Sequence, residues 1–140
     1  MTFDNFFDLL GDLDWLAVVV GAVVFMVVGW LWYGPLFGKQ WSAGTGIAMD
    51  SGTPATDKLI AMFVYSFVLS GAVNFLYHGR LTDDIEHALV AGIVLGIFVI
   101  GSASYSAVVW EKQQQSVWMI NTLFVFVAIT IVYYVQGLMA

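Results

Sequence analysis

Four long apolar stretches, separated by shorter polar segments, dominate the sequence. None of them contains Asp, Glu, Lys, Arg or His, and each approaches the roughly 20 residues that cross a bilayer's hydrocarbon core. They extend from Trp15 to Trp32, from Leu59 to Tyr77, from Ala88 to Val109 and from Val117 to Val135. Because Trp and Tyr also flank these stretches, as is typical at headgroup depth, the pattern predicts an all-α integral membrane four-helix bundle. It forms a single membrane domain over 1-140, with spans at about 15-35, 58-78, 87-110 and 116-137.

The segment before the first span has a helical period of its own. Phe3, Phe6, Phe7 and Leu10 recur at i, i+3, i+4 and i+7, while most of the aspartates fall on the other side. This pattern predicts a short amphipathic interfacial helix over 2-11.

The three connections differ in length. The first, residues 34-57, is rich in Gly, Ser and Thr and is expected to be a loop, with Pro35 ending the first span at Gly34 and Thr56 or Asp57 capping the second helix. The other two are short, so consecutive helices are expected to be antiparallel neighbours.

Composition narrows the function classes. With 61% hydrophobic residues and 10% charged ones, the chain cannot cover a water-soluble surface, and its first partner is the lipid bilayer. A net charge of −6 with four Lys and Arg excludes nucleic acid as a partner. Since the sequence has no Cys, disulfides and thiolate metal sites are excluded as well.

The basic residues indicate an orientation. Lys39, Lys58 and Lys112 lie in the first and third connections, and Arg80 lies in the second. Positively charged connections stay in the cytoplasm, which places both termini outside.

The third span carries small residues at four-residue intervals. Ala88, Gly92 and Gly96 begin the pattern, and Ser102 and Ser106 continue it. Such a stripe lets another helix approach closely in lipid, and that helix can belong to the same chain or to another protomer.

Polar side chains inside the spans form a candidate seam. Ser66, Ser70 and Asn74 share one face of the second span. In the fourth span, Asn121 and Thr122 come first, and Thr130 and Gln136 follow. The seam could line a path for a solute, or it could join helices by hydrogen bonds. Proton-coupled antiport is disfavoured because the spans lack an ionisable group, whereas a passive channel or carrier is not.

The second connection gathers His78, His87 and three carboxylates. An imidazole here is a weak candidate for a metal or tetrapyrrole ligand, but the spacing matches no metal motif and no cofactor is predicted. Asp83 or Asp84 is expected to cap the third helix instead. Nowhere does a nucleophile accompany a base, so an enzyme is not predicted.

The end of the first span carries an unusual aromatic string, GWLWYGPLFGKQW over residues 29-41. It resembles domain-of-unknown-function family 1761, small prokaryotic membrane proteins with four spans, and Trp118, Ile120 and Asn121 resemble that family's Trp-x-Ile-Asn run at the last span. The resemblance implies a membrane location and a four-helix layout, and no specific activity. For a prokaryotic protein of this kind we expect the cytoplasmic membrane. The first motif is matched at Trp32, Tyr33, Pro35, Leu36, Phe37, Gly38, Lys39 and Trp41.

These features predict a membrane packing and interaction module, either a homo-oligomer or a subunit that binds another membrane protein, associating through the face around Gly92 and Gly96. A small channel or carrier for an ion or neutral solute is the alternative. A pigment- or metal-binding subunit that uses His78 or His87 is the second alternative.

Overall fold

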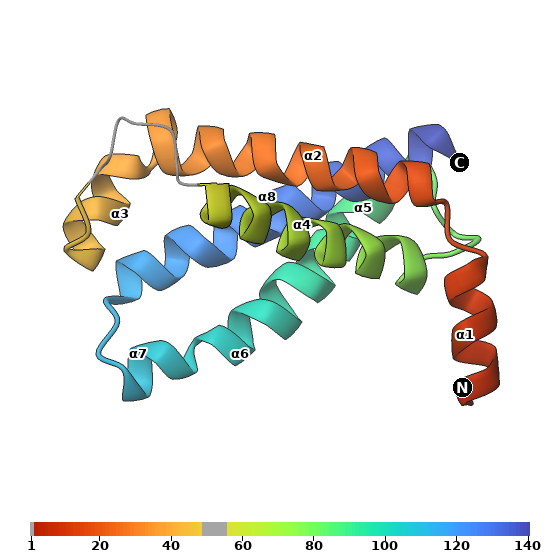
Figure 1. The fold of residues 1–140 in the computed structure, drawn as a ribbon. Coiled ribbons are helices and arrows are strands. Elements are labelled where there is room, and N and C mark those ends of the chain that lie inside the picture. Colours follow the sequence, from red (N-terminus) through yellow and green to blue (C-terminus); the bar gives the residue numbers. More distant parts are fainter. Residues whose placement is uncertain (1, 49–55) are drawn as a thin grey trace.

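The computed structural model describes residues 2–48 and 56–140, and these residues are almost entirely helical. Within them, four helical segments are long and apolar enough to cross a membrane, as the sequence predicts. They are Trp15–Leu36, Thr56–Leu76, Ile85–Trp110 and Gln115–Met139. Figure 1 shows them side by side, with both termini and the α4–α5 connection at one end of the molecule.

Two of the four spans contain wider π-helical turns, the first at its end and the third in its middle. The first consists of α2 (Trp15–Leu31) and the π-turn η1 (Trp32–Leu36), and α4 (Thr56–Leu76) and α8 (Gln115–Met139) are continuous. Outside the spans lie α1 (Phe3–Gly11) and α3 (Gly38–Thr45). The third span is divided into α5 (Ile85–Ala91), the π-helix η2 (Gly92–Gly101), α6 (Ser102–Ser104) and α7 (Ser106–Trp110).

The predicted N-terminal helix is present as α1. Thr2 caps it by accepting a hydrogen bond from the Asn5 backbone N–H. The helix runs across the direction of α2 rather than along it (Figure 1). Phe6 packs against Phe75 of α4, with ring centroids 5.5 Å apart, while Phe3 and Phe7 are exposed. An amphipathic helix lying across the spans suits the plane of a membrane surface.

The first connection corrects two expectations. Helical geometry does not stop at Gly34, because the backbone widens into η1 and the Phe37 N–H reaches the Trp32 carbonyl at 2.8 Å. The span ends at Leu36, one residue after Pro35. The expected loop also contains α3, which ends at Gly46 with φ of 74°, a left-handed conformation that glycine adopts without steric cost. Residues 49–55 of this connection lie outside the described part of the chain. Thr56 is the first residue of α4.

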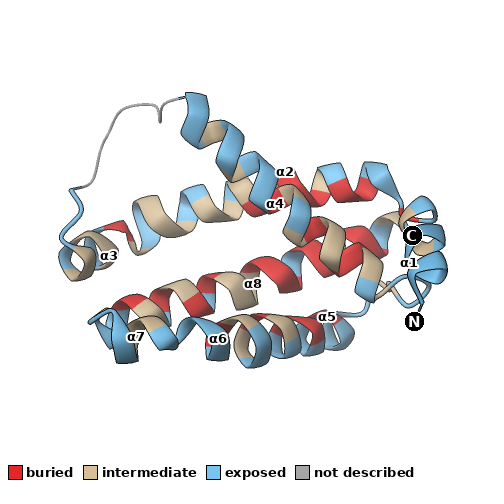
Figure 2. Cartoon of the chain, turned by 60° about the horizontal axis from the view of Figure 1, so that its bottom comes forward, coloured by how far each residue is buried: buried red, intermediate tan, exposed pale blue. Residues whose placement is uncertain are grey.

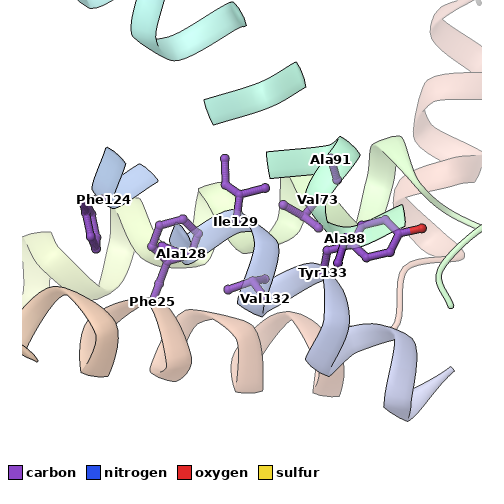
Figure 3. Close-up of a cluster of buried hydrophobic side chains, with 9 residues drawn as sticks. All are labelled: Phe25, Val73, Ala88, Ala91, Phe124, Ala128, Ile129, Val132 and Tyr133. Atoms are coloured by element: carbon purple, nitrogen blue, oxygen red, sulfur yellow. The ribbon is translucent and has the colours of Figure 1, made fainter. Parts of the chain in front are cut away.

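The core lies around α8, the most buried of the four spans (Figure 2). Its Ala128, Ile129 and Val132 pack with Phe25 of α2 and Val73 of α4, as Figure 3 shows. Since no water competes in a bilayer, shape complementarity of this kind holds spans together.

The second and third spans are not packed against each other as the short connection predicts. Helix α4 packs chiefly against α2, whereas α5 and η2 pack against α8. The connection passes over the end of α8, where a Cβ added at Gly137 would overlap the Thr82 carbonyl. The Tyr133 hydroxyl donates a hydrogen bond to the Arg80 carbonyl at 2.9 Å. The connection is therefore fixed to α8, and α4 and the third span flank the central α2–α8 pair.

The small-residue stripe faces α8 of the same chain. Ala88, Gly92 and Gly96 are buried, and a Cβ added at Gly96 would lie 2.7 Å from the Phe126 Cα. Beyond Gly96 the next buried glycine is Gly101, five residues on. The contact therefore follows the wider π-helical turn rather than a constant four-residue interval.

Ser102 and Ser106 correct the predicted extent of that stripe, because both are exposed and lie off the contact with α8. The Ser102 hydroxyl donates to the Phe98 carbonyl and the Ser106 hydroxyl to the Ala103 carbonyl. Both hydroxyls thus bond to their own helix.

Candidate functional site

The predicted polar seam divides between two places in the structure. Ser66, Ser70 and Asn74 are buried on the inner face of α4, between 0% and 1% exposed. Asn121, near the start of α8, belongs to another group of contacts, since its side chain pairs with the Tyr33 hydroxyl. Figure 1 shows the start of α8 at the end of the molecule opposite the termini. The seam is therefore not a continuous row across the bundle.

Gln136 of α8 organises the first group. Its side-chain Nε2 lies 2.9 Å from the Ser70 Oγ, 3.2 Å from the Ser70 carbonyl and 3.3 Å from the Ala17 carbonyl. Ser70 donates in turn to the Val18 carbonyl at 2.8 Å. These bonds tie α2, α4 and α8 together at one level, next to Gly21, where a Cβ would overlap the Ser70 hydroxyl.

Asn74 extends this group towards the end of the bundle that carries the termini. Its Nδ2 donates to the Gln136 Oε1 at 3.4 Å, and its Oδ1 accepts from the Asp14 backbone N–H at 3.2 Å. The Asp14 carboxylate caps α2 by accepting from the Ala17 N–H at 3.1 Å. The start of α2 is thereby fixed beside the buried amides.

A cleft of about 280 Å³ opens at this end of the molecule. It reaches the buried amides of Asn74 and Gln136, whereas Ser66 and Ser70 lie outside its lining. The lining combines acidic, amide, imidazole and apolar groups, from Asp12, Asp14, Asn74, His78, Gly79, Leu81, Gln136 and Ala140.

The two aromatic motifs meet at the other end. The Trp32 indole N–H donates to the Ile120 carbonyl at 3.0 Å, and the Tyr33 hydroxyl donates to the Asn121 Oδ1 at 2.7 Å. Trp41 packs edge-on against Tyr33, with ring centroids 5.9 Å apart. The motif thus joins the end of the first span and α3 to the start of α8.

The remaining motif positions shape this joint. Pro35 and Leu36 lie in the π-turn, Phe37 packs on the Trp32 ring, and Gly38 is buried at the start of α3. Lys39 is exposed.

Trp118 binds the third span to the same region of α8. Its indole N–H donates to the Gly101 carbonyl at 2.9 Å, and its ring packs edge-on against Tyr105. The start of α8 therefore receives one indole hydrogen bond from the first span and gives one to the third.

The two histidines occupy different surroundings. His87 contacts the Asp84 carboxylate at 3.2 Å, and both side chains are largely exposed. Asp84 caps α5 by accepting from the Glu86 N–H at 2.8 Å, and this backbone hydrogen bond lowers the pKa of its carboxyl, with His87 adding to the effect. His78 borders the cleft. Among residues 2–48 and 56–140, no three His, Asp or Glu side chains converge as metal ligands. A metal or tetrapyrrole at His78 or His87 stays an untested alternative.

Gln136, the last polar residue of the fourth span in the predicted seam, completes the buried group on α4. Its signal in the sequence is a lone amide near the end of an apolar span. The partners that give it a role come from α2 and α4, far away in the sequence.

The fold and these contacts define a four-span all-α membrane bundle whose helices are joined by aromatic contacts at one end and by buried amides near the other. Residues 16–137 match the model of a family described as "Protein of unknown function (DUF1761)", and the chain belongs to this family. The resemblance carried by the aromatic motif is thus confirmed. Neither the curated proteins nor the solved structures compared with the chain include a significant match.

Proposed function

We propose that this protein is a membrane interaction module that associates with a second copy of itself, or with a larger membrane assembly, through the outer face of α4. The main support for this proposal is the exposure of α4. Only 22% of the apolar window of α4 is buried within the chain, against 39% for α8. Its outer face presents Ile60, Val64 and Val68, each more than half exposed.

The spacing and chemistry of these three residues support the proposal. They stand four residues apart, so they form one ridge along the helix, and ridges of this kind fit into the grooves of another helix. Their branched side chains have few rotamers and lose little entropy on packing. In lipid, where hydrophobicity does not drive association, a stiff ridge that packs closely is a favourable contact surface.

The α4 face replaces the face around Gly92 and Gly96 as the association surface. Those glycines are already covered by α8, and their close approach to Phe126 leaves no room for a helix from another chain. The small residues thus serve packing within the chain.

Single cysteines test the proposal directly, since the natural sequence contains none. Val64→Cys on α4 and Val99→Cys on η2 are matched, because both valines are 53% exposed. Oxidation in native membranes is expected to cross-link Val64→Cys into a dimer, or to a partner protein, and to leave Val99→Cys monomeric. Cross-linking of Val99→Cys alone, or of neither variant, would contradict the proposal.

We also propose that the protein lies in a prokaryotic cytoplasmic membrane, with both termini outside the cytoplasm. Figure 1 shows both termini and the α4–α5 connection at one end of the molecule, and α3 and the α7–α8 connection near the other. Arg80 belongs to the α4–α5 connection, whereas Lys39 belongs to α3 and Lys112 to the α7–α8 connection. This charge difference supports cytoplasmic placement of the lysine end. A C-terminal alkaline phosphatase fusion should be active and a C-terminal green fluorescent protein fusion dark; the reverse result would invert the topology.

The cleft favours a second candidate, a small carrier or channel for an ion or neutral solute. It brings polar groups to the end of the spans and reaches two buried amides. Reconstituted protein should then raise solute flux into liposomes above that of empty vesicles. Equal flux across ions and neutral solutes would contradict this candidate without touching the first.

A further inference from the structure

The cleft beside α1 has a polar floor that its own contacts do not fully use. Asn74 and Gln136 are each 1% exposed, yet both line it. An amide oxygen can accept two hydrogen bonds and an amide nitrogen can donate two. The described contact to the Gln136 Oε1 is a single long one, 3.4 Å from the Asn74 Nδ2. The floor therefore retains acceptor capacity on a side chain that is otherwise removed from solvent.

The rim of the cleft is acidic. Asp12 and Asp14 line it, and within the described residues neither forms an ion pair. No Lys or Arg is among the lining residues. Asp14 has one carboxylate oxygen engaged in capping α2, whereas Asp12 caps α1 through its backbone N–H and not through its side chain. The electrostatic field in the cleft therefore favours a positively charged guest.

The size of the cleft favours a polyatomic guest. A volume of about 280 Å³ exceeds the share of a single water molecule, which is about 30 Å³ in the liquid. The described residues do not provide three converging metal ligands. A cation with several atoms and N–H donors, by contrast, can reach both the carboxylates and the amide oxygen.

We propose that this cleft binds a small organic cation with N–H donors, an alkylammonium or a guanidinium. The carboxylates of Asp12 and Asp14 attract the charge, and the Gln136 Oε1 accepts a hydrogen bond from the guest. Planar N–H donors and carboxylates form strong charge-assisted pairs. The cation site does not depend on self-association through α4. The inner face of α4 contributes to the cleft, whereas its outer face forms the proposed interface.

Binding is tested by isothermal titration of the full chain in detergent micelles with methylguanidinium, methylammonium and tetramethylammonium. The first two should bind, and tetramethylammonium, which has no N–H donor, should bind more weakly. Sodium chloride at equal ionic strength is the control for heat that arises only from the screening of charges by salt.

Variants of one exposed residue locate the site. Asp12→Asn should weaken methylguanidinium binding by about 1.5-fold to fivefold, the range for an exposed charge pair, and Asp12→Lys should abolish it by placing a tethered ammonium at the rim. Asp8→Asn and Asp8→Lys are the matched controls, since Asp8 is exposed on α1 and lies outside the lining.

Three results would overturn the proposal: no heat of binding for any probe, equal binding of tetramethylammonium or sodium, or equal effects of the Asp12 and Asp8 variants. A monomeric protein that still binds methylguanidinium would contradict the α4 interface and leave the cation site intact. The two proposals therefore fail separately.

Discussion

The two helices that flank the central α2–α8 pair are held by different physics. On one side, α4 is fastened by hydrogen bonds from buried polar side chains, with Ser70 and Asn74 bonded to α2 and to Gln136. On the other side, the third span lies on α8 through glycines that bring the two backbones close, and Gly96 faces the backbone of Phe126. Both arrangements replace the hydrophobic driving force that helices lose in lipid.

This difference predicts that the two helix contacts tolerate substitutions differently. A glycine contact fails abruptly when a side chain is added, because backbone atoms cannot move aside as a flexible side chain can. A hydrogen-bonded contact loses stability in smaller steps, since single polar contacts in membranes contribute about 0.6 kcal/mol each.

The largest expected effect is therefore Gly96→Ala in η2. The added Cβ would lie 2.7 Å from the Phe126 Cα and 2.8 Å from its backbone nitrogen, so we expect a loss of about 2 kcal/mol in the free energy of unfolding. Gly71→Ala in α4 is the matched control: its nearest neighbour would be the Val18 Cγ1 at 3.8 Å, and it should be neutral or slightly stabilising. Unfolding by SDS titration in micelles measures both. Equal effects would remove the distinction between the two sides.

Gln136→Met should have the next largest effect. Methionine keeps the length of the side chain and removes its bonds to Ser70, Ala17 and Asn74, so we expect a loss of about 1 to 2 kcal/mol. Gln115→Met at the exposed start of α8 is the control. A double-mutant cycle with Ser70→Ala should show coupling; strict additivity would mean that the bond between Ser70 and Gln136 does not hold α4 in place.

Trp118→Phe tests the indole hydrogen bond between α8 and the third span. It removes the bond to the Gly101 carbonyl and keeps an aromatic ring, so the expected loss is only about 0.6 kcal/mol. Trp110→Phe, at an 83% exposed position, provides the reference in the same SDS titration. A loss as large as that of Gly96→Ala would show that the third span depends on polar contacts after all.

The smallest effect concerns the start of the third span. The folded state lowers the pKa of Asp84, chiefly through the Glu86 N–H, so its contribution is present above the ordinary value of 3.8 and is lost as the pH falls through the lowered pKa. Thermal unfolding should therefore show a slight fall in stability in that acidic range. This fall should be smaller in Asp84→Asn, because the variant has no carboxyl group to titrate at this position. Asp83→Asn is the neighbouring control; an identical change in both variants would exclude a specific role for the cap.

The sequence predicted the fold well because its strongest signal, apolar length, is local. Four uninterrupted apolar stretches require four helices in lipid. The helix α3 escaped prediction, since its composition of Gly, Ser and Thr is typical of loops, and its packing depends on the distant start of α8. There a Cβ at Gly44 would overlap Val117.

The candidate site was less predictable for a geometric reason. A four-residue repeat assumes an α-helix, and the π-helix η2 moved the packing face to Gly101 and away from Ser102. The sequence marked Ser70 and Asn74 as polar positions on one face of a helix. It could not show that Gln136, more than 60 residues away, would complete their hydrogen bonds and form the floor of a cleft.

The central claim is that this chain completes its own core and leaves α4 free to meet a partner. The most direct test is the mass of the particle after gentle extraction into nanodiscs, measured by native mass spectrometry. We predict a discrete species above the 15.4 kDa of one chain, either a multiple of that mass or a complex of fixed composition, which Val64→Lys converts to the monomer. A wild-type protein found only at 15.4 kDa would contradict the claim.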